Sequence, residues 1–232
     1  MIDEKMIDEG YIKYRCEWIK RDDIAASEIT DLTRYRNALH RLNFIGEYPN
    51  GIGFGNLSQI FIPPLSDCHP PDHPPQFIIT GTQTGHLPTL SAADYALVTT
   101  FDPTQNTLTC IGQRQASSES LTHGVIYSAQ PAIGAIIHVH HPQLWQKLLH
   151  QVPTTGADVP YGTPEMAAET QRLFSESDLR QQRIFVMAGH EDGVVTFGEN
   201  LSTAYRVLIN WGTMTGIVSA SALQLPYEMA GS

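Results

Sequence analysis

Short apolar runs typical of β-strands alternate along this chain with stretches of helical spacing. The runs include QFIIT at 76–80, TLTCIG at 107–112 and AIGAIIHVHH at 132–141. Two more, RIFVMAG at 183–189 and GVVTFG at 193–198, flank a tight His-Glu-Asp-Gly turn and predict a hairpin. Because strands and helices interleave while some strands pair as hairpins, we expect an α/β fold with three layers, α/β/α. Its central sheet is expected to be mixed but mostly antiparallel, with helices covering it.

Helices are predicted where apolar residues recur at helical spacing behind a capping residue. The first covers 27–44, with Ser27 as its N-cap. Ser91 and Asp94 have the spacing of a capping box, which predicts a second helix running toward Thr99. The remaining helices are expected at 118–130, from Pro142, from Thr163 and Pro164, and from Leu201.

No linker divides the chain into two units. We expect a single domain at 27–232 behind an N-terminal extension at 1–26. Between 63 and 75, six of thirteen residues are proline, which excludes a helix or a central strand and predicts an exposed loop. That loop contains Cys68, His69 and His73, which could suggest a second metal site, but a solvated loop is the favoured interpretation.

Composition argues against several classes of partner. Lys and Arg number 14 against 24 Asp and Glu, and the net charge of -10 disfavours nucleic acid and anionic membranes but not a single small phosphate. The N-terminus is acidic without an apolar signal segment, and the longest apolar runs are far shorter than the roughly 20 residues of a membrane helix. Three scattered cysteines indicate no disulfide framework, so a cytoplasmic location is expected.

Two histidines in the run IIHVHH suggest metal binding. His138 and His140 are two apart in a predicted strand, so both face the same side of the sheet, whereas His141 faces the other side. Two imidazoles so placed can converge on one metal ion, and His190, at the end of a later strand, is a candidate third ligand. The spacing alone is equally compatible with hydrogen-bonded polar residues at a strand end.

A second group of residues is suited to acid–base chemistry and to holding an anion. Glu119 follows Ser117 and Ser118 at a predicted helix start, where free N–H groups attract a phosphate; an ordinary capped helix is the alternative. Glu119 and His123 share one helix face, either as an acid–base pair or as a plain side-chain contact. Anion cradles or simple turns are also predicted at Gly55, Asn56, Thr84 and Gly85.

The distribution of lysine bears on the type of chemistry. The chain has four lysines, and none lies between residues 21 and 146. A Schiff-base mechanism needs a buried lysine at the site, and the candidate catalytic segments contain none. We therefore expect any carbanion chemistry here to depend on a metal ion.

The order of the motifs resembles that of the class II aldolase/adducin family. The series GNLS, ITGTQTG, SSE, HVHH and GHEDGVVTFG lies within roughly residues 27–215, and five motifs in this order are far more specific than any one alone. The resemblance implies a divalent metal, commonly zinc, held by His138, His140 and His190, with Glu119 as the acid/base. It also implies that a substrate phosphate is held by Gly55, Asn56, Thr84, Gly85, Ser117 and Ser118.

The resemblance also sets expectations about activity. It implies a metal-dependent lyase that cleaves or dehydrates a small phosphorylated ketose through a metal-stabilised enediolate, as a homotetramer. A sugar-phosphate 4-epimerase of the same fold and a noncatalytic scaffold like the adducin head are the alternatives. Glu119, where epimerases often carry Asp, favours the lyase, and the complete set of ligands favours catalysis. Tyr161 and Tyr227 are candidates for an additional acid that some family members take from a neighbouring subunit.

Overall fold

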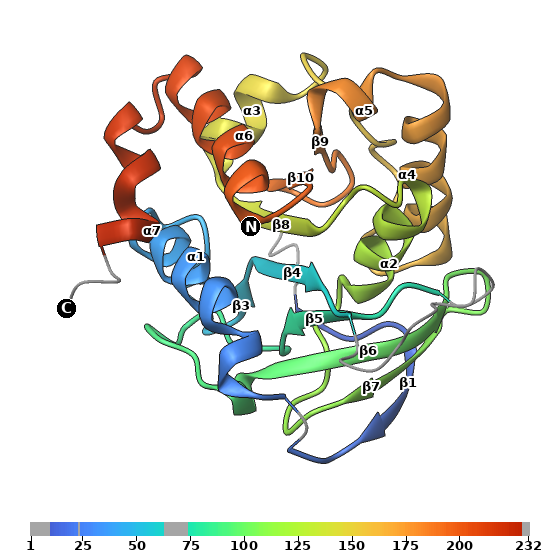
Figure 1. The fold of residues 1–232 in the computed structure, drawn as a ribbon. Coiled ribbons are helices and arrows are strands. Elements are labelled where there is room, and N and C mark those ends of the chain that lie inside the picture. Colours follow the sequence, from blue (N-terminus) through green and yellow to red (C-terminus); the bar gives the residue numbers. More distant parts are fainter. Residues whose placement is uncertain (1–9, 23, 63–73, 229–232) are drawn as a thin grey trace.

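The computed structural model describes residues 10–22, 24–62 and 74–228, and an eight-stranded sheet is its main element (Figure 1). The strand order is β1-β7-β6-β5-β4-β8-β10-β9, and all neighbours are antiparallel except β1 and β7. The strands of this sheet are β1 Arg15–Ile19, β4 Asn56–Ile60, β5 Phe77–Thr80, β6 Tyr95–Asp102, β7 Thr107–Ile111, β8 Ala135–His140, β9 Ile184–Val186 and β10 Gly193–Gly198. A small second sheet pairs β2 (Gly46–Glu47) with β3 (Gly53–Phe54).

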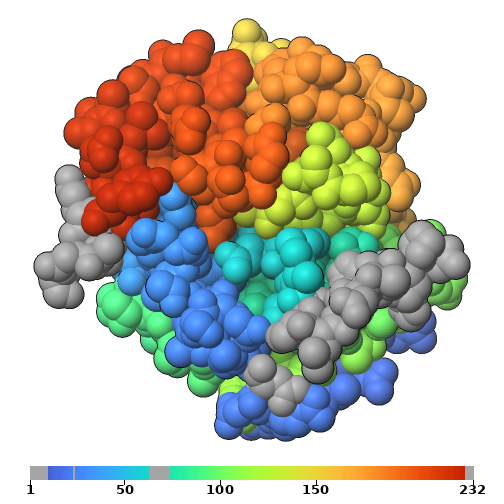
Figure 2. All heavy atoms as spheres, viewed as in Figure 1, coloured from blue at the N-terminus to red at the C-terminus, as the bar shows by residue number. Residues whose placement is uncertain are grey.

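Helices cover both faces of the large sheet, which confirms the predicted α/β/α layers. One apolar core packs α1 (Thr30–Arg41), α3 (Pro142–Leu148) and α6 (Leu201–Met214) on one face. A second core packs α2 (Ser120–Ala129) and α4 (Pro164–Glu176) on the other face. The short helix α5 (Leu179–Gln182) follows α4, and Figure 2 shows the C-terminal segment with α7 (Leu225–Glu228), in red, lying against α1, in blue.

Strand β8 illustrates how the sequence selects the two faces. Ile137 and Val139 enter the core beneath α1 and α6, whereas Ile136 enters the core beneath α2 and α4. Alternation along the strand then places His138 and His140 on the same face as Ile136. The polar end of this otherwise apolar strand therefore lies on the side of the sheet that α2 covers.

The predicted helix from Ser91 toward Thr99 is wrong. The capping box does form, because the Asp94 carboxylate accepts hydrogen bonds from Ser91, but it closes only a single 3₁₀ turn at Ala92–Asp94. The chain then enters β6, whose residues YALVTTFD pair with β5 and β7. β-branched and aromatic side chains favour the sheet at this position, and strand pairing outweighs a local helix start.

The other predicted elements are confirmed, but α1 is shorter than predicted and begins at Thr30 behind Ile29. Ser27 lies in a 3₁₀ turn at Ala26–Glu28, so its prediction as the N-cap of the first helix is wrong. Thr163 caps α4 by accepting from the Met166 N–H, and the predicted hairpin is the antiparallel pair β9–β10. Strand β1, within the proposed N-terminal extension, was not predicted; it pairs with β7 and brings the free thiols of Cys16 and Cys110 to 3.4 Å. None of the described helices is long and apolar enough to cross a bilayer.

Candidate active site

Three histidines gather at the end of β8. His138 and His140 come from the strand, and His190 comes from the turn between β9 and β10. All three side chains are buried, and one ring nitrogen of each lies within 4.8 Å of the others. By contrast, His141 leaves this cluster and caps α3 on the opposite face, where its Nδ1 accepts from the Leu144 N–H.

Strand register explains what surrounds the histidines. Asn56 on β4 lies directly opposite His138, and Gly193 on β10 lies directly opposite His140. A Cβ atom at Gly193 would lie 3.3 Å from His138 Nε2 and 3.4 Å from His190 Nδ1. The missing side chain therefore leaves open the space between these imidazoles.

Burial favours a neutral ring at His138, and hydrogen bonds hold the Nδ1 atoms of His138 and His140. Burial first, and then the neighbouring His140, His190 and His123, lower the pKa of His138 well below its ordinary value. His138 Nδ1 contacts Asn56 Nδ2 at 3.2 Å, and His140 Nδ1 contacts the Tyr48 hydroxyl at 2.9 Å. These contacts hold the Nδ1 atoms and orient the opposite edge of each ring toward the centre of the cluster.

Asn56 joins the histidine cluster to the pocket beside it. Its Oδ1 atom has no hydrogen-bond partner among the described residues, although the side chain is buried. If the side-chain amide is rotated by 180°, Oδ1 can accept a hydrogen bond from a protonated Nδ1 of His138. A histidine that binds a metal through Nε2 needs such an acceptor for its Nδ1–H group. The same rotation directs the Nδ2 donor to the neighbouring pocket, which Asn56 also lines.

Glu119 lies beside this cluster at the start of α2. Its side chain is 2% exposed, and its Oε1 lies 3.9 Å from His190 Nδ1. The other oxygen, Oε2, accepts a hydrogen bond of 2.9 Å from the Thr122 hydroxyl. One buried carboxylate is thus fixed next to three buried imidazoles, each neutral when it acts as a ligand.

His123 shares the helix with Glu119 but makes different contacts. Its Nδ1 is 2.7 Å from the Ser58 hydroxyl, which in turn is 2.7 Å from the Tyr127 hydroxyl. The histidine is fully buried, and burial lowers its pKa to about 3. The structure therefore places His123 in a neutral hydrogen-bonded network beneath the site.

Burial of neutral His123 predicts a loss of stability in mild acid. The pKa of His123 is about 6.5 in the unfolded chain and about 3 in the folded protein. At a pH between these two values, the unfolded chain therefore binds one proton more than the folded protein. The free energy of unfolding should therefore fall below pH 6.5, by about 1 kcal/mol per pH unit. Urea denaturation of chelator-treated protein at pH 7.5 and 5.5 measures the fall, and it should be about 1 kcal/mol smaller in His123→Leu. Equal pH dependence in the two proteins would contradict the assignment.

The residues predicted to hold a phosphate lie around one small pocket. Its volume is about 20 Å³, close to that of one water molecule, and Gln83 bridges it by donating to the Gly10 carbonyl and accepting from the Gly53 N–H. Gln83 is exposed, so an anion could displace its side chain. A Cβ atom at Gly85 would lie 2.0 Å from the Gly46 carbonyl oxygen, so only glycine fits there. The predicted residues on the pocket wall are Gly55, Asn56, Thr84, Gly85, Ser117 and Ser118.

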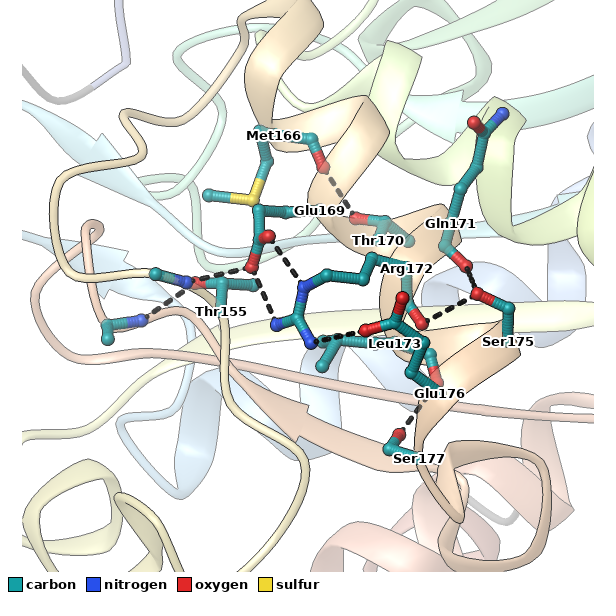
Figure 3. A network of polar contacts seen from close by, with 12 residues as sticks. Thr155, Met166, Glu169, Thr170, Gln171, Arg172, Leu173, Ser175, Glu176 and Ser177 are labelled. Atoms are coloured by element: carbon teal, nitrogen blue, oxygen red, sulfur yellow. Dashed lines mark hydrogen bonds and ion pairs between the residues drawn. The ribbon is translucent and has the colours of Figure 1, made fainter.

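A polar network around α4 supports the turn that carries the third histidine (Figure 3). Glu169 forms an ion pair with Arg172 at 2.8 Å and accepts from the Gly156 N–H at 2.9 Å. The preceding residue, Thr155, accepts from the Ala188 N–H at 3.0 Å, just before the turn. The network ties α4 to the end of β9 and so restrains the position of that turn.

Residues 10–14 cover one side of the site, which sequence reasoning missed. Lys13 Nζ lies 3.8 Å from the centroid of the Tyr161 ring, and Tyr161 stacks on His190 with centroids 4.4 Å apart. Tyr14 donates to the Ala116 carbonyl at 2.7 Å, next to the serine motif. Although residues 21–146 contain no lysine, Lys13 from the N-terminal segment therefore lies next to the site.

Tyr161 and Tyr227, the two tyrosines predicted as candidate acids, lie in different places. Tyr161 is buried against His190, as described above. Tyr227 on α7 is half exposed, and its hydroxyl is 3.2 Å from that of Tyr35 in the core on the opposite face of the sheet. Only Tyr161 belongs to the histidine site of its own chain. The possible second metal site at Cys68, His69 and His73 lies outside the described residues.

The donor set fits a divalent transition metal. Three neutral imidazoles with an adjacent carboxylate are ligands that suit zinc and its neighbours. His138 Nε2 is buried without a hydrogen-bond partner among the described residues, and it borders the space beside Gly193. A metal ion in this space would satisfy that nitrogen, so the buried group of three histidines could bind a metal.

Comparison with known proteins agrees with this geometry. The family described as the class II aldolase and adducin N-terminal domain matches residues 50–215, more than half of the chain. The chain belongs to the class II aldolase/adducin family. The match includes the three histidines, Glu119 and the six residues predicted to hold a phosphate, so the resemblance predicted from the motif order is confirmed at the level of the family.

Solved structures of this family share the fold. An L-fuculose 1-phosphate aldolase superposes with a TM-score of 0.57 at 18% identity, over 90% of this chain and 99% of that one. A sugar-phosphate aldolase from Thermotoga maritima gives 0.58 at 17%, over 88% and 96%. YgbL from Escherichia coli, provisionally assigned as an aldolase, epimerase or decarboxylase, gives 0.58 at 16%, over 85% and 96%. At these identities the likeness extends to the class II aldolase fold alone.

Proposed function

We propose that this protein is a metal-dependent lyase that cleaves or dehydrates a small phosphorylated ketose. The observation that supports this proposal is the convergence of three buried imidazoles and the Glu119 carboxylate beside a pocket of hydroxyl and backbone groups. Asn56 lies between the two parts, so one small substrate could contact both. We further propose Zn²⁺ as the ion and a homotetramer as the assembly, in line with the family.

Each part of the site has a role in this proposal. His138, His140 and His190 would hold the ion, which when bound supplies Lewis-acid polarisation of the substrate carbonyl. Glu119, oriented through Oε2 by Thr122, would move a proton to and from the substrate. The pocket would anchor the phosphate with the Asn56 amide, hydroxyls and backbone N–H groups, through Gly55, Asn56, Thr84, Gly85, Ser117 and Ser118.

The two alternatives are a 4-epimerase of the same fold and a noncatalytic scaffold. An epimerase would convert a phosphorylated sugar without releasing an aldehyde or water. A scaffold has no need of buried ligand residues, so the intact cluster of three histidines with Glu119 argues against it. The lyase remains the preferred proposal because a carboxylate next to the cluster suits proton transfer during bond cleavage.

A screen of phosphorylated ketoses and aldehydes against zinc-loaded protein tests the proposed reaction. We expect release of an aldehyde or of water from at least one phosphorylated ketose, and little turnover of its unphosphorylated form. A chelator should abolish the activity, and added Zn²⁺ should restore it, because the three histidines would bind an ion that the reaction needs. Epimerisation without cleavage would favour the first alternative. A metal-free protein that is insensitive to chelators and inactive on the whole panel would favour the scaffold.

A further inference from the structure

Arg36 is a buried cation that the sequence did not single out. It lies on α1 with only 1% of its side chain exposed. Its Nη2 donates to the carbonyl oxygens of Thr84 and Gly85, each at 2.9 Å. Burial lowers the pKa of Arg36 to about 10, so the guanidinium stays charged at neutral pH.

The charge of Arg36 has no ion-pair partner among the described residues. Its Nη1 is buried there without a hydrogen bond. Asp94, whose charge acts on Arg36, is itself paired with Arg114 at 2.9 Å. A buried cation without a counter-ion destabilises a protein, and an anion bound nearby would offset that cost.

The contacts of Arg36 orient the turn that forms one wall of the small pocket. In a trans peptide the N–H points away from the C=O of the same unit. With the Thr84 and Gly85 carbonyls directed at Arg36, the N–H groups of Gly85 and His86 point to the other side. Gly85 lines the pocket, and its N–H donates to no other residue in the described part of the chain. The Thr84–Gly85 turn therefore has peptide N–H donors on one side and the Arg36 guanidinium on the other.

We propose that Arg36 is a positioning residue of an anion pocket that takes a phosphate monoester dianion. From behind the Thr84–Gly85 turn it aligns the peptide N–H groups and supplies the positive charge that the pocket wall itself lacks. The proposal deepens the proposed function and rests on it, because it assigns the substrate phosphate to this pocket. It also adds a charged residue to a phosphate site for which only uncharged residues of the chain were predicted.

Calorimetric titration of the zinc-loaded protein with inorganic phosphate, against a chloride background, tests this proposal. Arg36→Gln retains an amide donor but removes the charge, and it should bind phosphate at least tenfold more weakly. Arg36→Lys can still carry a positive charge, and it should bind phosphate more tightly than Arg36→Gln. The exposed Arg41, at the end of the same helix, provides the control Arg41→Gln, which should bind like the wild type. Melting temperature and zinc content are measured for every variant.

A second pair of variants leaves Arg36 intact in case Arg36→Gln fails to fold. His40 follows Arg36 by one helical turn, so His40→Glu would set a carboxylate beside the guanidinium, whereas His40→Gln would not. We expect His40→Glu to weaken phosphate binding at least threefold relative to His40→Gln.

The outcomes separate this proposal from the proposed function. Phosphate affinity that is unchanged in Arg36→Gln and in His40→Glu overturns the role of Arg36 and leaves the lyase proposal standing. An equal loss in Arg36→Lys and Arg36→Gln overturns the role of the charge. A wild-type protein that binds zinc but no phosphate overturns both the anion pocket and the choice of a phosphorylated substrate.

Discussion

Replacing His138 by Ala is expected to remove the bound metal from the protein. His138 is a buried member of the cluster, and its Nε2 borders the space that Gly193 leaves open. Losing one of three imidazole ligands leaves two that cannot complete a tetrahedral site. Zinc content after dialysis, measured by elemental analysis, should fall from about one equivalent to near zero.

His141→Ala is the matched control for this experiment. His141 is the neighbouring histidine, but its side chain lies on the opposite face, where it caps α3 by accepting from the Leu144 N–H. Loss of the cap should cost about 1 kcal/mol of stability and leave the zinc content unchanged. A full equivalent of zinc retained by His138→Ala would disprove the assignment of the cluster as a metal site.

Replacing Glu119 by Gln is expected to abolish turnover while the metal stays bound. The substitution preserves the size of the side chain and its hydrogen bond with Thr122, but it removes the group proposed to carry a proton. The loss of a positioned acid–base group lowers kcat about 10²- to 10⁴-fold. Steady-state kinetics on a substrate found in the screen measures kcat, and elemental analysis measures the zinc content.

Glu165→Gln supplies the control for this change. Glu165 is an exposed carboxylate in the first turn of α4, so its neutralisation alters the net charge without touching the cluster. We expect wild-type kcat from this variant. Activity of Glu119→Gln within a factor of about three of the wild type would assign the proton transfer to another group, and Tyr161, stacked on His190, would be tested next.

Much of the fold and the membership of the site could be predicted from the sequence. The alternation of side chains along a strand predicted that His138 and His140 face the same side of the sheet, and the predicted hairpin turn carries His190 at the same end of the sheet. The motif order supplied the remaining candidates, because side chains far apart in sequence meet only through the β4–β8 and β8–β10 pairing. The sequence alone shows the motifs but not this register.

The features that sequence reasoning missed all depend on tertiary packing. The segment YALVT at the start of β6 becomes a strand because partners exist on both sides, although a capping box precedes it. Arg36 and Tyr48 lie outside any motif, and their roles arise from contacts with residues 48 and 92 positions away. Residues 10–14 carry no periodic signal, yet they pack against Tyr161 and the serine motif.

The position of Asn56 has a thermodynamic consequence. One amide contacts a candidate metal ligand and also lines the candidate anion pocket, so the two ligands would share a single orienting group. If metal loading fixes that amide with its N–H₂ toward the pocket, phosphate affinity rises by some factor. Reciprocity then requires that phosphate raise the affinity for the metal by the same factor. The protein would retain its ion most firmly while a phosphorylated ligand is bound, and titration of either ligand in the presence of the other would report the same coupling free energy.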